Sequence, residues 1–279
     1  MYFCRAMELY QTQIEKTLKL MRPITLEQMA SVKLMKRTDS KYVTNLATLV
    51  QLLELAKANY YVQEIQNSRM AHYNTLYWDF PEDHRYYLVH AQKRKPRTKV
   101  RTRRYLDSGI AFLEIKRKDN HGKTRKKRVS VPLGESIQED SLHGQDFLME
   151  QLGLKFDQLI PTMSNFFTRI TLVNYAKTER VTIDLQLRIE NHETGLKADL
   201  GNAVIIELKR DGRTSSPLSA ILRKLRIKPS GFSKYIIGTA VTNPNLRKNP
   251  IRKRLRKLAK TIHHPDSYLG AYQSDSKTA

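Results

Sequence analysis

Residues 97–105 read RTKVRTRRY, and this stretch decides the fold. Cations stand at every second position, as Arg97, Lys99, Arg101 and Arg103. Because successive side chains of a β-strand point to opposite faces, this spacing predicts a strand with a row of cations on one face. Like charges at that spacing repel each other. The row therefore indicates an extended anionic ligand, such as a chain of phosphates, rather than one small anion.

The same alternation recurs along the chain. Apolar residues alternate with polar, cation-rich positions in segments 33–43, 110–118, 124–131, 179–190 and 203–210. Strict alternation predicts strands with one buried and one hydrated face. A solvated outer face accounts for any single strand, but an ordinary surface mixes charge signs more evenly. We therefore predict an α+β fold in which a closed antiparallel β-barrel surrounds a cationic lumen, with helices packed outside.

The longest alternating segment, 179–190, forms a predicted hairpin with residues 166–174. We expect its apolar residues to share one face of the strand and its polar residues to share the other. The apolar set is Val181, Ile183, Leu185, Leu187 and Ile189, and the polar set is Arg180, Thr182, Asp184, Gln186 and Arg188.

Composition limits the class of partner. The chain has 279 residues, with 50 Lys and Arg against 27 acidic residues and a net charge of +23. Such an excess indicates a polyanionic partner, namely nucleic acid, polyphosphate, a nucleotide or an anionic membrane. The single Cys4 excludes an internal disulfide and a cysteine-based zinc site. No stretch approaches the roughly 18–20 apolar residues that span a bilayer, and residues 1–20 lack a signal-peptide core, so we expect a cytoplasmic location.

The C-terminal region differs in kind from the alternating segments. Residues 245–262 combine eight Lys and Arg with Ile251, Leu255, Leu258 and Ile262 at helical spacing. This pattern predicts a basic amphipathic helix, which either packs on the domain or contacts an anionic membrane surface or a membrane-protein partner. We therefore divide the chain into a domain over 1–243, with its core at about 30–243, and a basic helix with a polar tail over 244–279.

Motifs for known phosphate chemistry are absent from the sequence. There is no GxxxxGK[ST] loop, no GxGxxG loop and no HExxH-type spacing of metal ligands. Phosphate chemistry would have to depend on side-chain cations and a carboxylate-bound metal, a combination that phosphoryl transfer can use. Glu207 is the lone carboxylate on the polar parity of segment 203–210, next to Lys209.

A set of short segments, taken in order, resembles a known family, the triphosphate tunnel metalloenzymes. Within that family the set is most similar to the catalytic domain of vacuolar transporter chaperone (VTC) polyphosphate polymerases, in the bacterial stand-alone form. The matching segments are 37–42, 75–79, 99–105, 112–118, 126–128, Arg169, 179–184, 206–209 and 232–235.

The resemblance implies a role for each matching residue. Phosphates of ATP and of a growing polyphosphate chain would lie in the barrel, and Glu207 would hold Mn²⁺ or Mg²⁺. The implied catalytic cations are Lys41, Arg101, Arg103, Lys116, Lys126, Arg169, Lys209 and Lys234. The implied substrate-binding residues are Lys118, Arg128, Arg180 and Ser233. Lys118 stands where fungal members carry a His, and Gly231 stands where a basic residue is expected.

Other residues on these strands have simpler expected roles. We expect Glu114 and Asp184 to orient Arg and Lys side chains rather than to act as catalysts. We expect Arg104, Arg117 and Arg125 to be surface charges because their parity is opposite to that of the lumen. Tyr77 and Trp78 are expected in the core.

The predicted function is that of an ATP-dependent polyphosphate polymerase, acting in the cytoplasm or at the inner face of the membrane. One alternative is a metal-dependent hydrolase of tripolyphosphate or nucleoside triphosphates with the same fold. Hydrolytic relatives carry an ExExK motif on the first strand, whereas residues 37–42 contain one acid, Asp39. The other alternative is a nucleic-acid-binding module, which is disfavoured because no exposed aromatic residues alternate with the cations for base stacking.

Overall fold

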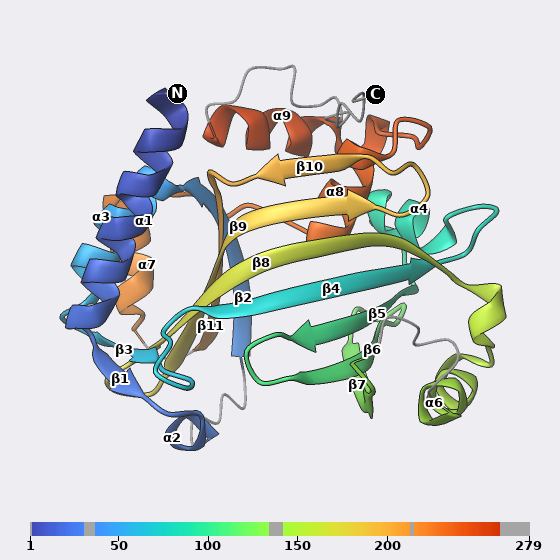
Figure 1. The fold of residues 1–279 in the computed structure, drawn as a ribbon, viewed down its shortest axis with the longest axis horizontal. Helices are drawn as coiled ribbons and strands as arrows, with labels where there is room; N and C mark the ends of the chain where they lie inside the picture. Colours follow the sequence, from blue (N-terminus) through green and yellow to red (C-terminus); the bar gives the residue numbers. More distant parts are fainter. Residues whose placement is uncertain (1, 31–36, 134–141, 213–214, 263–279) are drawn as a thin grey trace, which may run out of the picture.

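The computed structural model describes residues 2–30, 37–133, 142–212 and 215–262. Within these residues the chain folds into one large, mainly antiparallel sheet with helices around it, the predicted α+β class (Figure 1). The strands are β1 (Arg22–Ile24), β2 (Arg37–Asn45), β3 (Tyr60–Gln63), β4 (Ala71–Asp79), β5 (Arg97–Tyr105), β6 (Ile110–Lys118), β7 (Thr124–Val131), β8 (Ile160–Asn174), β9 (Glu179–Asn191), β10 (Lys197–Leu200) and β11 (Ala203–Asp211). The helices are α1 (Tyr2–Leu20), α2 (Leu26–Ala30), α3 (Leu46–Ala56), α4 (Arg85–Ala91), α6 (Leu142–Leu152), α7 (Pro217–Lys224), α8 (Lys234–Thr242) and α9 (Arg252–Thr261), with 3₁₀ turns η1 (Phe156–Gln158) and η2 (Asn249–Ile251).

The sheet has the strand order β2-β11-β9-β8-β4-β5-β6-β7, with β10 beside β9, β3 beside β8 and β1 beside β3. No ladder in the described part of the chain joins the two end strands, β2 and β7, so the predicted closed barrel is not confirmed. Lys41 on β2 and Lys126 on β7 both lie on the cation-bearing face, and like charges disfavour direct pairing of the two strands.

The predicted elements agree with the structure at most positions. The sequence Asp119-Asn120-His121-Gly122-Lys123 also predicts a hairpin turn after β6, and the structure has it. Gly122 has φ of 86°, the Asp119 N–H donates to the Lys123 carbonyl at 3.0 Å, and the Lys123 N–H donates to Asp119 Oδ1 at 2.9 Å. The short strand β10 was not expected from the sequence. Residues 33–36 of the predicted strand 33–43 lie outside the described residues. The sequence also predicts a helix over 138–152, of which residues 138–141 lie outside the described residues and α6 forms the rest.

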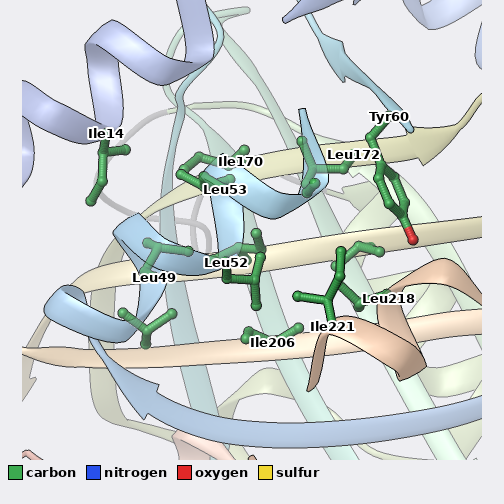
Figure 2. Packing of buried hydrophobic residues seen from close by; sticks show 14 of the residues in the cluster. Ile14, Leu49, Leu52, Leu53, Tyr60, Ile170, Leu172, Ile206, Leu218 and Ile221 are labelled. Atoms are coloured by element: carbon green, nitrogen blue, oxygen red, sulfur yellow. The ribbon is translucent and has the colours of Figure 1, made fainter. Parts of the chain in front are cut away.

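Three helices, α1, α3 and α7, lie together at one side of the sheet and cover the apolar face of β2, β11, β9 and β8 (Figure 1). The sequence predicts Thr44 or Asn45 as the cap of helix α3, and the structure has Asn45, whose Oδ1 accepts a hydrogen bond from the Thr48 backbone N–H at 3.0 Å. Its Leu49, Leu52 and Leu53 are fully buried in the cluster that Figure 2 shows. Burial of each such side chain contributes about 1.5–3 kcal/mol, so this cluster holds the helices on the sheet.

Strand β9 does not keep one apolar face along its length. Gln186 has a positive φ of 55°, and the register with β8 shifts between Phe166 and Thr168. This bulge turns the following residues over. The prediction of a single apolar face over 179–190 is therefore wrong. Val181, Ile183 and Leu185 pack in the cluster with α1, α3 and α7, whereas Leu187 and Ile189 pack with α8.

Helix α8 lies on the polar face of the sheet, where the prediction placed no helix. The Tyr235 ring stacks on Tyr77, with ring centroids 4.8 Å apart. Tyr77 is the register partner of Arg101, so both side chains belong to the cation-bearing face. The bulge on β9 explains this position, because it brings Leu187 and Ile189 onto that face and gives α8 an apolar surface to cover.

The predicted basic helix over 245–262 is present as η2 and α9. Its apolar residues Ile251, Leu255, Leu258 and Ile262 are buried in the same cluster as α8. The apolar side of the helix thus packs on the domain, which is the first of the two roles expected from the sequence. The division of the chain at residue 243 stays a prediction.

A third cluster lies under α6, at the opposite side of the sheet from α1 (Figure 1). Trp78, Val100 and Ile115 are buried there, on the reverse side of the strands that carry the cations. The core positions predicted for Tyr77 and Trp78 are confirmed, since their exposed fractions are 4% and 3%.

Candidate functional site

The ladders bring most of the predicted cations onto one face of the sheet, which we call the cationic face. Neighbouring residues in a register share a face, so the pairs Lys99–Lys116 and Lys116–Lys126 place three Lys side by side across β5, β6 and β7. The cationic face includes Lys41, Lys99, Arg101, Arg103, Lys116, Lys126, Arg169 and Lys209 from the strands and Lys234 from α8. The register gives Arg97, Lys118, Arg128 and Arg180 the same parity.

The sheet curves so that its two halves approach each other. Lys41 lies on β2, and Lys99 and Lys116 lie on β5 and β6, several strands away along the sheet. Lys41 is nevertheless close enough to contribute, after burial, to lowering the pKa of both Lys99 and Lys116. Glu207 opposes the shift at Lys116, so β11 also faces β6. The cations therefore surround a common space, and an extended anion in that space would relieve their repulsion.

Lys99 is a member of this face that the site prediction omitted. Burial, with Lys41 and Arg101, holds its pKa well below the usual range. Its Nζ donates to Ser233 Oγ at 3.0 Å and lies 5.9 Å from the centre of the Tyr235 ring. The signal for Lys99 was present in the sequence, since it belongs to the alternating row of residues 97–105.

Glu114 lies at the centre of one group of cations. Arg101 donates to Glu114 Oε2 from Nε at 2.8 Å and from Nη2 at 2.6 Å, and Lys126 Nζ donates to Oε1. The carboxylate is 1% exposed. Burial opposes its ionisation, but Arg101, Arg103 and Lys126 outweigh burial and lower the pKa of Glu114 to about 2. The predicted orienting role of Glu114 agrees with these contacts.

Asp184 holds a second group beside α8. Arg169 donates to both of its oxygens, from Nε to Oδ1 at 2.6 Å and from Nη2 to Oδ2 at 2.8 Å, and Lys234 Nζ donates to Oδ2. Although burial opposes ionisation, these two cations hold the pKa of Asp184 well below its usual range. Burial lowers the pKa of Lys234 to about 7, with Asp184 opposing the shift and Arg169 reinforcing it. Lys234 Nζ also lies 3.4 Å from the centre of the Phe167 ring.

Arg103 lies between these two groups. Its Nε donates to Thr75 Oγ1 at 3.3 Å, and its guanidinium carbon is 5.9 Å from the centre of the Tyr73 ring. Burial, with Arg101 and Arg169, lowers the pKa of Arg103 to about 10. No carboxylate in the described residues forms a salt bridge with Arg103, so this cation is available to an anionic ligand.

Glu207 has few cation contacts. Its nearest salt-bridge partner is Lys209, with Nζ 3.8 Å from Oε1, and its side chain is 24% exposed. Burial raises its pKa, but Lys41, Lys209 and Arg169 outweigh burial and lower it, so Glu207 is an anion at neutral pH. No group of three or more His, Cys, Asp or Glu in the described part of the chain could hold a metal ion. A single free carboxylate suits Mg²⁺ or Mn²⁺ that completes its coordination with water and phosphate oxygens.

The predicted substrate-binding residues are not all at the same place. Ser233 caps α8 and accepts the hydrogen bond from Lys99. Arg180 is the register partner of Lys209, beside Glu207. Arg128 is exposed, with its guanidinium carbon 4.2 Å from the centre of the Phe112 ring. Lys118, at the end of β6, lies in the lining of a pocket at the turn after that strand.

The chain is similar to a known protein family and to solved structures. The sequence model described as the VTC domain matches residues 36–243. No curated protein matches the chain. Among solved structures, a protein from Bacillus halodurans assigned provisionally as an adenylate cyclase is 14% identical, with a TM-score of 0.46, and the match covers 73% of this chain and 98% of that chain.

A second solved structure is a provisionally assigned adenylyl cyclase from Hippeastrum, which is described as having a dominant triphosphatase activity. It is 16% identical, with a TM-score of 0.45, and the match covers 76% of this chain and 98% of that chain. In the described residues of our chain, no helix is both long and apolar enough to cross a membrane.

Proposed function

The chain belongs to the VTC domain family, and on that premise we propose that it is an ATP-dependent polyphosphate polymerase. The proposed reaction transfers the γ-phosphoryl group of ATP to the end of a polyphosphate chain. The single observation that carries the proposal is the approach of Lys41 to Lys99 and Lys116 across the cationic face, in the absence of enough carboxylates to neutralise them. Such a space suits a linear chain of phosphates.

The proposed step needs no covalent intermediate on the protein. A terminal phosphate oxygen of the growing chain attacks the γ-phosphorus of ATP, the bond from that phosphorus to the bridging β–γ oxygen breaks, and ADP leaves. Arg101, Arg103 and Arg169 would stabilise the charge on the transferred group. Their carboxylate partners Glu114 and Asp184 fix two of these guanidinium groups before the substrate binds, which is the condition for effective electrostatic catalysis.

The proposed metal ligand is Glu207. A bound Mn²⁺ or Mg²⁺ would neutralise part of the charge on the phosphate oxygens. Glu207 is suited to this role because it is ionised and, among the described residues, has only Lys209 within salt-bridge distance. Lys209 and its register partner Arg180 would bind phosphates beside it.

The two alternatives predict different products. A hydrolase would transfer the phosphoryl group to water and release free phosphate. A nucleic-acid module would bind without turnover, and the structure gives it little support, because four of the aromatic rings on this face, those of Tyr73, Tyr77, Phe167 and Tyr235, are buried. Tyr73 stacks on Phe167 with centroids 5.1 Å apart, and Tyr77 stacks on Tyr235.

The test is incubation of the protein with ATP and Mn²⁺, followed by a gel for long polyphosphate. We expect polymer and ADP. Free phosphate without polymer would identify the hydrolase, and DNA or RNA binding without turnover would identify the third class. The matched pair Arg103→Met and Arg104→Met then tests the site, since adjacent residues of β5 lie on opposite faces. Polymer formation should fall only in Arg103→Met.

Besides its substrates, we propose that the protein binds an anionic membrane surface on the cytoplasmic side, through α9. Arg252, Lys253, Arg256, Lys257 and Lys260 are exposed on this helix, whereas its apolar side is buried against the domain. Contact would therefore be electrostatic, without insertion of apolar side chains.

A further inference from the structure

A pocket of about 410 Å³ lies on the reverse side of the strands that carry the cationic face, and we call it the reverse-face pocket. It is formed at the ends of β5, β6 and β7, at the turn between β6 and β7, and by Gln151 of α6. Its charged lining residues are Arg97, Arg117, Lys118, Lys123, Arg125 and Lys127, together with one acid, Asp119.

The register places the centre of this pocket opposite the cationic face. Arg117 pairs with Arg125, and Ile115 pairs with Lys127. These residues alternate with Lys116 and Lys126, which belong to the cationic face, so their side chains point to the other side. Ile115 supports this assignment, because it is buried in the cluster under α6. The centre of the pocket is therefore separate from the site described above, and only at its edge does it include Arg97 and its register partner Lys118, which have the parity of the cationic face.

The charges in the reverse-face pocket are not balanced by the described residues. Arg117 and Arg125 are direct cross-strand neighbours, an arrangement that destabilises a sheet. Neither they nor Lys127 form a salt bridge with another described residue. The Arg117 guanidinium donates to the Gln151 backbone carbonyl at 3.2 Å, which orients it without neutralising it. Asp119 accepts a hydrogen bond from the Lys123 backbone N–H at 2.9 Å and serves the turn.

We propose that the reverse-face pocket is a second binding site for linear inorganic polyphosphate. Five cations on three strands, with Lys123 in the turn beside them, exceed what one orthophosphate could neutralise, whereas a chain of phosphates could contact them in sequence. The part of the lining that the structure describes contains no aromatic residue, so it offers no platform for stacking of nucleic-acid bases. The ligand class rests on the proposed function, since the polymer would be the product of the same enzyme.

Strand β7 supplies a route between the two sites. It is an end strand of the sheet, and its consecutive residues Arg125, Lys126, Lys127 and Arg128 are all exposed. Because they alternate between the two faces, cations are present on both sides of this edge. A polyphosphate chain that leaves the cationic face can pass over β7 and stay in contact with cations until it reaches the reverse-face pocket.

The experiment is calorimetric titration of the full chain with tripolyphosphate, in EDTA and without ATP, so that no turnover consumes the ligand. We expect two sites per chain in the unchanged protein. The triple variant Arg117→Gln, Arg125→Gln and Lys127→Gln should keep one site, because each lost charged hydrogen bond weakens binding by about tenfold. Arg103→Met should lose the site on the cationic face and keep the site in the reverse-face pocket.

A matched control removes the same number of charges elsewhere, by Arg252→Gln, Arg256→Gln and Lys260→Gln on α9, and it should keep both sites. One site in the unchanged protein, two sites in the Arg117 triple variant, or an equal loss in the α9 control would each overturn the proposal. So would displacement of tripolyphosphate from the second site by single-stranded DNA at equal phosphate concentration. Failure of the proposed polymerase is distinguishable, since it would abolish polymer on the gel and leave the two-site titration intact.

Discussion

The region around Glu114 and the region around Glu207 carry the same kinds of side chain in different arrangements. Glu114, on β6, is 1% exposed and is held by Arg101 and Lys126, with the closest Arg101 contact at 2.6 Å. Glu207, on β11, is 24% exposed and has Lys209 at 3.8 Å. Both are ionised, and both lie on the cationic face.

The difference shows that one residue type can have two functions on one face. Glu114 has its oxygens occupied by cations, so it fixes the position of Arg101 and Lys126 and cannot accept a metal without losing them. Glu207 keeps acceptor capacity for a divalent ion. The predictions below test whether the two carboxylates differ in this way, in order of decreasing expected effect.

The largest expected effect is the loss of folding stability caused by Glu114→Gln. Removing this carboxylate leaves Arg101 and Lys126 uncompensated, and breaking a buried ion pair costs about 3–5 kcal/mol. Urea unfolding at neutral pH, without ligand, measures the loss. Glu207→Gln is the control and should unfold at nearly the same urea concentration as the unchanged protein.

The Glu114 carboxylate should also make the stability of the folded protein depend on pH. Its folded-state pKa of about 2 lies below the ordinary value of 4.5, so its contribution to stability is fully present above about pH 4.5 and is lost as pH falls toward 2. Glu114→Gln should lack this part of the acid sensitivity. An identical acid profile in both proteins would show that Glu114 is not the paired group.

The second effect concerns turnover in Glu207→Gln. If Glu207 holds the metal, turnover should fall by at least about 100-fold, the scale expected for loss of one strong electrostatic contributor. The measurement is initial rate against Mn²⁺ concentration. Near-normal activity at saturating Mn²⁺ would exclude Glu207 as the ligand and would remove the proposed contrast with Glu114.

The third effect concerns Lys234, the cation that Asp184 holds in the same way as Glu114 holds Lys126. Its folded-state pKa of about 7 lies below the ordinary 10.5, so between these values the unfolded chain binds more protons, and stability without ligand rises with pH. Bound phosphate favours the charged form, so tripolyphosphate affinity should fall above about pH 7, by at most about tenfold per pH unit.

Lys234→Arg is the matched variant, because Arg keeps its charge over this range. Calorimetric titration in buffers of different ionisation enthalpy should show more proton uptake on binding at pH 8 in the unchanged protein than in the variant, where only other groups such as Lys99 can still take up protons. Equal proton uptake in both would assign the titration to another group.

The last effect concerns α9, which carries neither carboxylate and should leave their contrast unchanged. The triple variant Arg252→Gln, Arg256→Gln and Lys260→Gln should weaken binding to anionic vesicles by about 1 kcal/mol per cation at low salt. Turnover in solution should not change. Truncation would not test this, because Ile251, Leu255 and Leu258 are part of the core and their loss would destabilise the domain. Equal binding of both proteins to anionic vesicles would refute membrane docking by α9.

The sequence alone determined the local part of this arrangement. The alternation in residues 97–105 predicted that Arg101 and Arg103 share a face, and the ladders with β4 and β6 agree. The amphipathic spacing of residues 245–262 was also readable, although the sequence left open whether its apolar side packs on the domain or meets a membrane. These features depend on the period of a strand or a helix, which is fixed by backbone geometry over a few residues.

Only the tertiary structure decided how the cations are used. The bulge at Gln186 has no Gly to mark it, and it brings α8 onto the cationic face with Lys234 and Ser233. The occupation of Glu114 and the relative freedom of Glu207 depend on which strands meet across the curved sheet. Those contacts join residues far apart in the chain. Lys99 is buried only when the strands and α8 have come together, and this burial is what lowers its pKa.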